Sequence, residues 1–119
     1  MHDTKNQEGI ILMETINRMA AVVTPLKPFF DWSESVLGKE ANDCDPEAFR
    51  TVFLIPERTD IGKSLRAVYD EILEQMLVAS VNDSSLWPGD LSFRNFKKWF
   101  DVQLVEMVFD AGRGPVEHD

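Results

Sequence analysis

The chain has 119 residues, of which 44% are hydrophobic and 28% are charged, and its formal net charge is −9. This length holds one ordinary domain, and the composition is that of a packed globular protein rather than a disordered one. The negative charge opposes binding to nucleic acids and to anionic membrane surfaces, and no apolar run reaches the roughly 20 residues that a membrane span requires.

The N-terminal residues and the cysteine content bear on the compartment. Residues 1–16 lack the basic stretch and the long apolar run of a signal peptide. The single cysteine, Cys44, has no second cysteine with which to form an internal disulfide. We therefore expect a soluble protein of a reducing cytoplasm.

Three regions follow from the distribution of polar and apolar residues. We expect an N-terminal extension over residues 1–18, one domain over residues 19–110 and a flexible tail over residues 111–119. Within the extension, Gly9–Arg18 carries an apolar cluster that fits either a short helix or an added strand.

Two segments of the first half have the composition of β-strands. Met19–Thr24 is stopped by Pro25, and Ala48–Ile55 is stopped by Pro56. The second half of Ala48–Ile55 is apolar on both faces, so we expect helices to cover both faces of the sheet. With a helix between them, the two strands fit a right-handed parallel unit.

Apolar periodicity predicts helices around these strands. The first has Pro28 in its opening turn, an apolar stripe through Phe29 and Trp32, and a C-terminal stop at Gly38. The longest follows Asp60 or Thr59 as its cap. Its apolar residues recur every three or four positions: Ile61, Leu65, Val68, Ile72, Met76 and Ala79.

The last third of the chain supplies a short helix and a final strand. Ser92 caps the helix Phe93–Phe100, and Val102–Phe109 is the strand. The element order is therefore β-α-β-α-α-β. It predicts an α+β or small α/β fold, with a sheet of three strands, or of four if Gly9–Arg18 adds one.

Catalytic and metal-binding motifs do not assemble in the sequence. His2 and His118 lie at the two polar ends, which disfavours a histidine base or a zinc site. Cys44 lies in an acidic loop, which disfavours its thiolate. Asp43 and Asp45 have the spacing of a calcium loop, but the glycine and glutamate that such a loop needs are missing. We expect no metal and no cofactor, and the sequence leans against an enzyme.

One corner is the candidate for a ligand or a partner. It consists of the loop residues Trp87 and Pro88 and of the carboxylates Asp101 and Asp110 at the two ends of the final strand. Loop tryptophans are frequent anchors in protein interfaces, but a tryptophan that plugs the end of the sheet is the interpretation we favour for Trp87. Carboxylates beside apolar segments are able to transfer protons.

Three functions are compatible with these observations. The first is a small cytoplasmic interaction or regulatory protein with a protein partner, such as a homodimer through an exposed strand edge. The second is a carboxylate-based enzyme or small-ligand binder near Trp87 and Asp101. The third is an acidic mimic of DNA, although surface charge more commonly serves solubility.

Several short motifs in this order resemble a family of small uncharacterised bacterial proteins. The matching positions are Pro25, Lys27, Pro28, Phe29, Trp32, Ile55, Pro56, Glu57, Trp87, Pro88, Phe96, Trp99, Phe100, Val108 and Asp110. The chain departs from the pattern by its N-terminal extension, by Leu26 between Pro25 and Lys27, and by its glycine-containing tail. The family carries no assigned activity, so the resemblance implies a fold and no chemistry.

Overall fold

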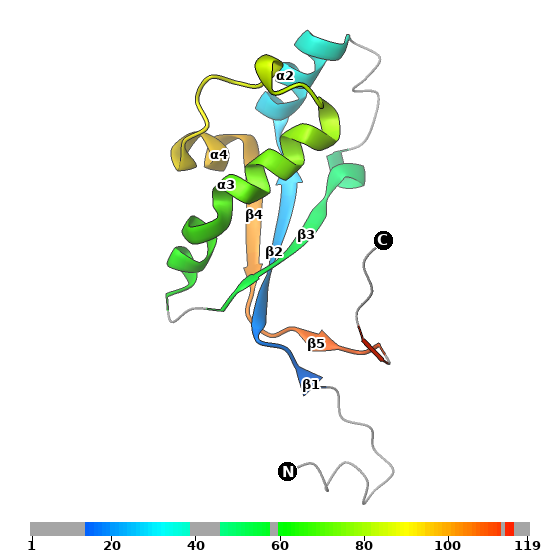
Figure 1. The fold of residues 1–119 in the computed structure, drawn as a ribbon, viewed down its shortest axis with the longest axis vertical. Coiled ribbons are helices and arrows are strands. Elements are labelled where there is room, and N and C mark those ends of the chain that lie inside the picture. Colours follow the sequence, from blue (N-terminus) through cyan, green and yellow to red (C-terminus); the bar gives the residue numbers. More distant parts are fainter. Residues whose placement is uncertain (1–13, 39–45, 58–59, 113, 116–119) are drawn as a thin grey trace, which may run out of the picture.

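The structure is a computed structural model, and it describes residues 14–38, 46–57, 60–112 and 114–115. The predicted α+β class is confirmed, because helices pack on a three-stranded antiparallel sheet from which a short two-stranded ribbon extends (Figure 1). The predicted order β-α-β-α-α-β is confirmed for the sheet and its helices. No helix in this part of the chain is long and apolar enough to cross a membrane.

The strands are β1 (Glu14–Thr15), β2 (Arg18–Pro25), β3 (Thr51–Pro56), β4 (Phe100–Val105) and β5 (Phe109–Asp110). The α-helices of the described residues are α2 (Lys27–Leu37), α3 (Ile61–Ser80) and α4 (Phe93–Trp99). Two short 3-10 turns, η2 (Pro46–Phe49) and η3 (Ser84–Leu86), precede β3 and α4.

The sheet has β2 at its centre, with β3 on one side and β4 on the other, both antiparallel to it. The predicted parallel unit is therefore wrong. The helix α2 stays at the C-terminal end of β2, where Phe29 packs on Phe100 with ring centroids 5.3 Å apart. The chain re-enters the sheet from that same end, with Thr51 opposite Val23, so β3 runs back along β2.

Within the described ranges, helices cover one face of this sheet and not the other, which corrects the expectation of cover on both faces. Along β2, Met19, Ala21, Val23 and Pro25 are buried against the helices. On β3 the burial alternates, with Ile55 buried and its neighbour Leu54 exposed. The apolar residues of β3 therefore divide between a core face and a face in contact with solvent.

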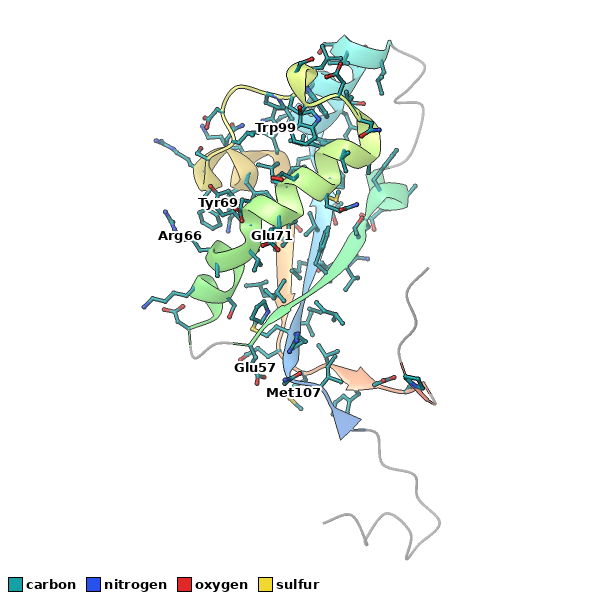
Figure 2. The ribbon with its side chains drawn as sticks, viewed as in Figure 1. Glu57, Arg66, Tyr69, Glu71, Trp99 and Met107 are labelled. Carbon is teal, nitrogen blue, oxygen red and sulfur yellow. The ribbon has the colours of Figure 1, made fainter. Side chains whose placement is uncertain are left out.

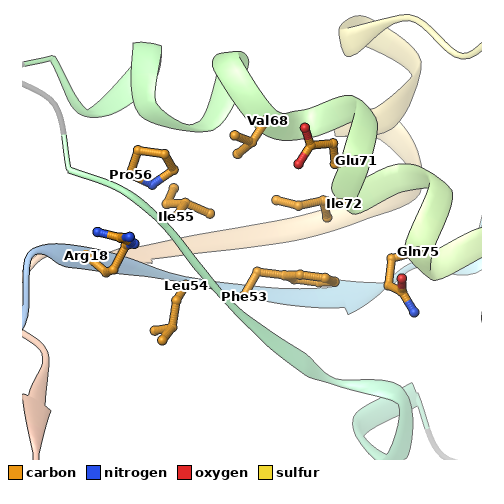
Figure 3. Close-up of a pocket in the computed structure, with 9 residues that line it drawn as sticks. All are labelled: Arg18, Phe53, Leu54, Ile55, Pro56, Val68, Glu71, Ile72 and Gln75. Atoms are coloured by element: carbon orange, nitrogen blue, oxygen red, sulfur yellow. The ribbon is translucent and has the colours of Figure 1, made fainter. Parts of the chain in front are cut away.

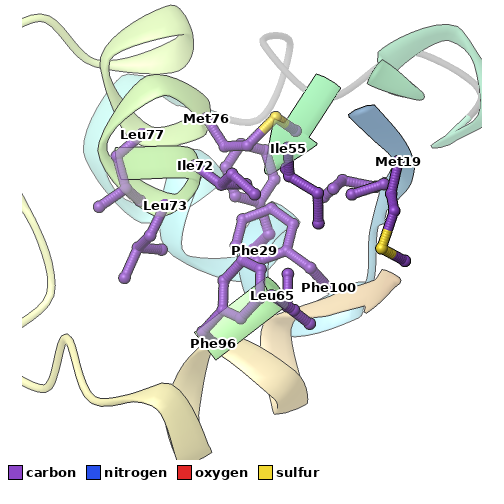
Figure 4. Close-up of a cluster of buried hydrophobic side chains, with 12 residues drawn as sticks. Met19, Phe29, Ile55, Leu65, Ile72, Leu73, Met76, Leu77, Phe96 and Phe100 are labelled. Atoms are coloured by element: carbon purple, nitrogen blue, oxygen red, sulfur yellow. The ribbon is translucent and has the colours of Figure 1, made fainter. Parts of the chain in front are cut away.

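The hydrophobic core lies between the helices and the covered face of the sheet (Figure 4). It contains Met19, Ala21 and Val23 from β2, Phe29 from α2, Ile55 from β3, Leu65, Ile72, Leu73, Met76 and Leu77 from α3, and Phe96 and Phe100. Of the predicted apolar stripe of α3, Leu65, Ile72 and Met76 are in the core and Val68 packs against it, whereas Ala79 is exposed. The side chain of Ile61 lies outside the described part. Because α3 contributes five of these side chains, it is the main cover of the sheet.

Local hydrogen bonds explain where the helices begin and end. The carboxylate of Asp60 accepts from the N–H groups of Gly62 and Lys63, which confirms Asp60 as the cap of α3. Ser92 accepts from the N–H of Asn95 at the start of α4, as predicted. Gly38 ends α2 at a φ of 98°, a left-handed conformation that other residues adopt only with strain.

Two predicted strands have different ends in the structure. Residues Pro46–Phe49 form a 3-10 turn, closed by a hydrogen bond of 3.2 Å from the N–H of Arg50 to the carbonyl of Glu47, so β3 begins only at Thr51. The final predicted strand, Val102–Phe109, is split into β4 and β5. The split leaves Glu106 exposed between the sheet and the ribbon.

Candidate functional site

The loop between α3 and α4 holds Trp87 in place rather than presenting it to solvent. The indole N–H of Trp87 donates a hydrogen bond of 2.8 Å to the carbonyl of Val81, and its half-buried ring packs against the core. Trp32 on α2 donates a bond of 3.0 Å to the carbonyl of Leu86 in the same loop. Both tryptophans therefore hold the loop by hydrogen bonds to backbone carbonyls, and Pro88 beside Trp87 is also half-buried.

Two aspartates form the turns at the ends of this loop. Asp83 accepts hydrogen bonds of 2.7 and 3.0 Å from the hydroxyl and the N–H of Ser85, and these bonds lower the pKa of Asp83. Asp90 accepts a bond of 3.0 Å from the N–H of Ser92, and hydrogen bonding to Ser92 lowers the pKa of Asp90. A carboxylate whose pKa falls on folding stabilises the fold above its ordinary pKa of about 3.9 and loses that effect as the pH drops through the lowered value.

We expect Ser85→Ala to bring the pKa of Asp83 back toward about 3.9, because the substitution removes the hydroxyl donor. A carbon-detected NMR titration of the side-chain carboxyl groups measures both aspartates in one experiment. Asp90, which does not contact Ser85, is the internal reference and should titrate as in the wild type. An unchanged inflection for Asp83 would contradict the assignment of this hydrogen bond.

The two carboxylates of the predicted corner lie far apart. Asp101 is opposite Thr24 at one end of β2, whereas Asp110 is opposite Glu14 in the ribbon. The ten positions from Glu14 to Thr24 correspond to about 30 Å of extended chain. Asp110 instead closes a local turn by accepting a bond of 2.8 Å from the N–H of Gly112. The structure does not bring Trp87, Asp101 and Asp110 into one site.

Other candidates of the sequence fall outside the described residues. These are His2, Asp43, Cys44, Asp45 and His118. Among the residues that the structure describes, no group of three or more histidine, cysteine, aspartate or glutamate side chains is placed to hold a metal ion.

The helix-free face of the sheet is the most unusual surface of the molecule. We call it the open face, and it consists of Ala20 and Val22 on β2, Val52 and Leu54 on β3, and Gln103 and Val105 on β4. Val52 and Leu54 are 60% and 55% exposed, which is high for large apolar side chains on a sheet.

Strand register arranges the open face in two rows. Leu54, Ala20 and Val105 form one row across the three strands, because Ala20 is opposite both of the others. Val52, Val22 and Gln103 form the next row. Five of these six side chains are apolar and adjacent, so they make one continuous patch rather than scattered single residues.

The ribbon of β1 and β5 adds apolar side chains beyond the end of the sheet. Met107, which lies between β4 and β5, is 67% exposed, and Phe109 on β5 is also exposed. Figure 2 shows Met107 at the end of the sheet opposite to Trp99. The ribbon is held by the β1–β5 pairing and by a bond of 3.1 Å from the N–H of Ile16 to the carbonyl of Val108.

The sequence did not single out the open face. Val52, Leu54 and Val105 lie in segments with the composition of strands, and that composition is the same for buried and exposed apolar residues. The alternation of polar and apolar residues that would separate the two faces of β3 is missing, because the half-buried Phe53 and the core residue Ile55, on the covered face, are apolar as well.

Comparisons with known proteins add no relative, because no protein-family model matches the chain and neither a curated protein nor a solved structure does.

Proposed function

We propose that this protein is a cytoplasmic protein-interaction module that associates with a second copy of itself through the open face. The observation that carries the proposal is the exposure of Val52 and Leu54 on a sheet whose other face is packed with helices. Sheets with one uncovered apolar face are stabilised when a second sheet packs on that face.

The distribution of charge supports a second copy as the partner. The centre of the open face has no charged side chain, although the chain as a whole carries −9. Charged residues lie at its two ends, with Arg18 at the start of β2 and Asp101 opposite Thr24 at the other end. If the twofold axis of the dimer lies between the two open faces and perpendicular to the strands, β2 of one copy runs antiparallel to β2 of the other. The start of each β2 then lies over the end of its partner, which brings Arg18 of each copy toward Asp101 of the other.

The area of the open face determines how stable the proposed dimer is expected to be. At about 3.3 Å per residue and about 4.8 Å between strands, the open face covers roughly 300 Å². A stable interface buries about 800 Å² on each partner. The sheet alone is too small, so the exposed Met107 and Phe109 of the ribbon belong to the same interface in our proposal, and we expect a dimer that depends on concentration.

The decisive experiment is sedimentation equilibrium of Leu54→Lys and Leu86→Lys beside the wild type. Both leucines are exposed, but Leu86 lies in η3, away from the sheet. We expect Leu54→Lys to weaken the dimer by at least about tenfold, because an ammonium without a partner is costly to bury, and Leu86→Lys to leave it unchanged. Circular dichroism checks that both variants are folded.

Ionic strength gives a second measure of the same interface. Two chains of charge −9 repel each other, so salt that screens this repulsion should strengthen a dimer whose contact surface is apolar. A wild type that stays monomeric up to millimolar concentration contradicts the proposal. A Leu54→Lys variant that dimerises like the wild type places the interface elsewhere.

A further inference from the structure

A groove runs along the edge of the sheet between β3 and α3, on the helix side of β3, and it shares Arg18 and Leu54 with the border of the open face. Figure 3 shows Phe53 and Ile72 pointing toward each other across it, with Leu54 directed to the other side of β3. Its cavity of about 390 Å³ lies within the range of about 300–1,000 Å³ typical of ligand sites. Besides Phe53 and Ile72, it is lined by Arg18, Leu54, Ile55, Pro56, Val68, Glu71 and Gln75.

A second cavity lies farther along β3 and α3, next to α2 and η2. It has a volume of about 220 Å³ and is lined by Thr51 on β3 and by Met76, Ala79 and Ser80 on α3, among others. The first cavity uses the Pro56 end of β3 and the second uses the Thr51 end. The two cavities therefore lie beside opposite ends of β3, and we call them together the edge groove.

The backbone of β3 explains what such a groove binds. In the described part of the chain, β3 pairs with β2 along one edge only. A strand edge without a neighbour presents N–H and C=O groups that pair with any extended chain, at a spacing of about 4.8 Å. The flank of α3 lies above this edge, so side chains of an added strand would pack on the half-buried Val68 and beside the exposed Gln75.

We propose that the edge groove binds an extended peptide segment of a partner protein, which adds to β3 as a fourth strand. The segment carries apolar side chains at alternate positions toward α3, where they contact Val68 and lie beside Gln75. A second copy of this chain fits poorly here. Its own β3 would bring its own α3 to the same edge, and the two helices would compete for one space.

The charge of the groove specifies the peptide further. Two charged side chains line the first cavity, Glu71 on its helical wall and Arg18 from β2. The guanidinium of Arg18 donates hydrogen bonds to the carbonyl and the side-chain oxygen of Asn17, and no cation of the described residues forms an ion pair with Glu71. A lysine or arginine in the segment at the height of Glu71 therefore finds a carboxylate, and the negative charge of the whole chain attracts a basic partner. In the recognised segment, apolar or basic residues facing α3 alternate with polar residues facing away from it.

Two synthetic peptides test the proposal on the full-length protein labelled with ¹⁵N. One is acetyl-Val-Thr-Lys-Thr-Val-Thr-amide, and the other carries glutamate in place of lysine. We expect the lysine peptide to shift the amide signals of β3 and to bind about two- to fivefold more tightly than the glutamate peptide, as for an exposed ion pair. Glu71→Lys should reverse this preference.

Asp70→Lys is the matched control. Asp70 is exposed on α3 but does not line the groove. Its substitution by lysine changes the net charge by the same amount as Glu71→Lys. It should therefore leave the preference for the lysine peptide intact. If both variants lost the preference for the lysine peptide to the same extent, the preference would depend on net charge alone. That result would overturn the assigned role of Glu71.

Three further results would overturn the peptide site. One is the absence of β3 shifts with either peptide at millimolar concentration, and another is shifts confined to the open face. The third is a set of nuclear Overhauser contacts between residues 10–13 and β3 in the protein without peptide, which would assign the groove to the chain's own N-terminal segment.

Discussion

Leu77→Ala should lower the free energy of unfolding by about 2–5 kcal/mol, the usual cost of truncating a buried leucine. Leu77 is 0% exposed and lies in the core cluster beneath α3. The loss has two parts, the transfer of the side chain from water and the cavity that remains. Because the free energy of unfolding of native proteins is about 5–15 kcal/mol, this single change removes a large share of the stability.

Urea denaturation followed by circular dichroism measures the loss. Leu37→Ala is the matched control, since it is the same substitution at a helical leucine that is 51% exposed at the end of α2. We expect Leu37→Ala to stay within about 0.5 kcal/mol of the wild type. Similar losses in the two variants would contradict the assignment of Leu77 to the core.

Trp87→Ala should also destabilise the fold strongly, by about 3 kcal/mol, the lower end of the range for large aromatic residues because the ring is only half-buried. The substitution removes the ring that packs against the core and the hydrogen bond to the carbonyl of Val81. The loop then loses the contact that fixes it to the end of α3.

Trp87→Phe separates the two effects, because phenylalanine keeps a ring and lacks the N–H donor. We expect it to cost about 1–2 kcal/mol, the price of a carbonyl left without its partner. Urea titrations of both variants give the two values. If Trp87 were a binding anchor on the surface instead, Trp87→Ala would leave the free energy of unfolding unchanged.

The helices were predictable because their signals are local. The stripe of α3 repeats every three or four residues and Asp60 stands directly before it, so period and cap agree. The same agreement holds for Ser92 at the start of α4 and for Gly38 at the end of α2. Such signals depend only on residues within a few positions of one another.

The arrangement of the strands was not predictable in the same way. A helix between two strands suggests a parallel crossover, but α2 has only 11 residues and packs at the end of β2 rather than along its length. That choice depends on contacts between Phe29 and Phe100, which are far apart in sequence. The pairing of β2 with β3 and β4 is therefore a property of the packed structure.

The predicted corner and the open face show why functional surfaces, like strand pairing, were not predictable from the sequence. The corner combined Trp87 with Asp101 and Asp110, but the two aspartates bound the final predicted strand. Nine extended positions between them already correspond to about 30 Å, so proximity along the chain did not place the two carboxylates in one site. The exposure of Val52 and Leu54 depends on the absence of a second layer of helices in the described structure. That exposure is not encoded in the spacing of residues.

The central position of β2 has a consequence for folding during synthesis. Ala20 pairs with Val105 and Pro25 with Phe100, so partners in the β2–β4 ladder are 75 to 85 positions apart in the chain. The middle strand leaves the ribosome before β4 and has only β3 as a neighbour in the sheet until Phe100–Val105 have also been made. High contact order of this kind slows folding and leaves apolar strand surface accessible meanwhile. Nascent chains that stop before β4 should therefore need a chaperone to stay in solution.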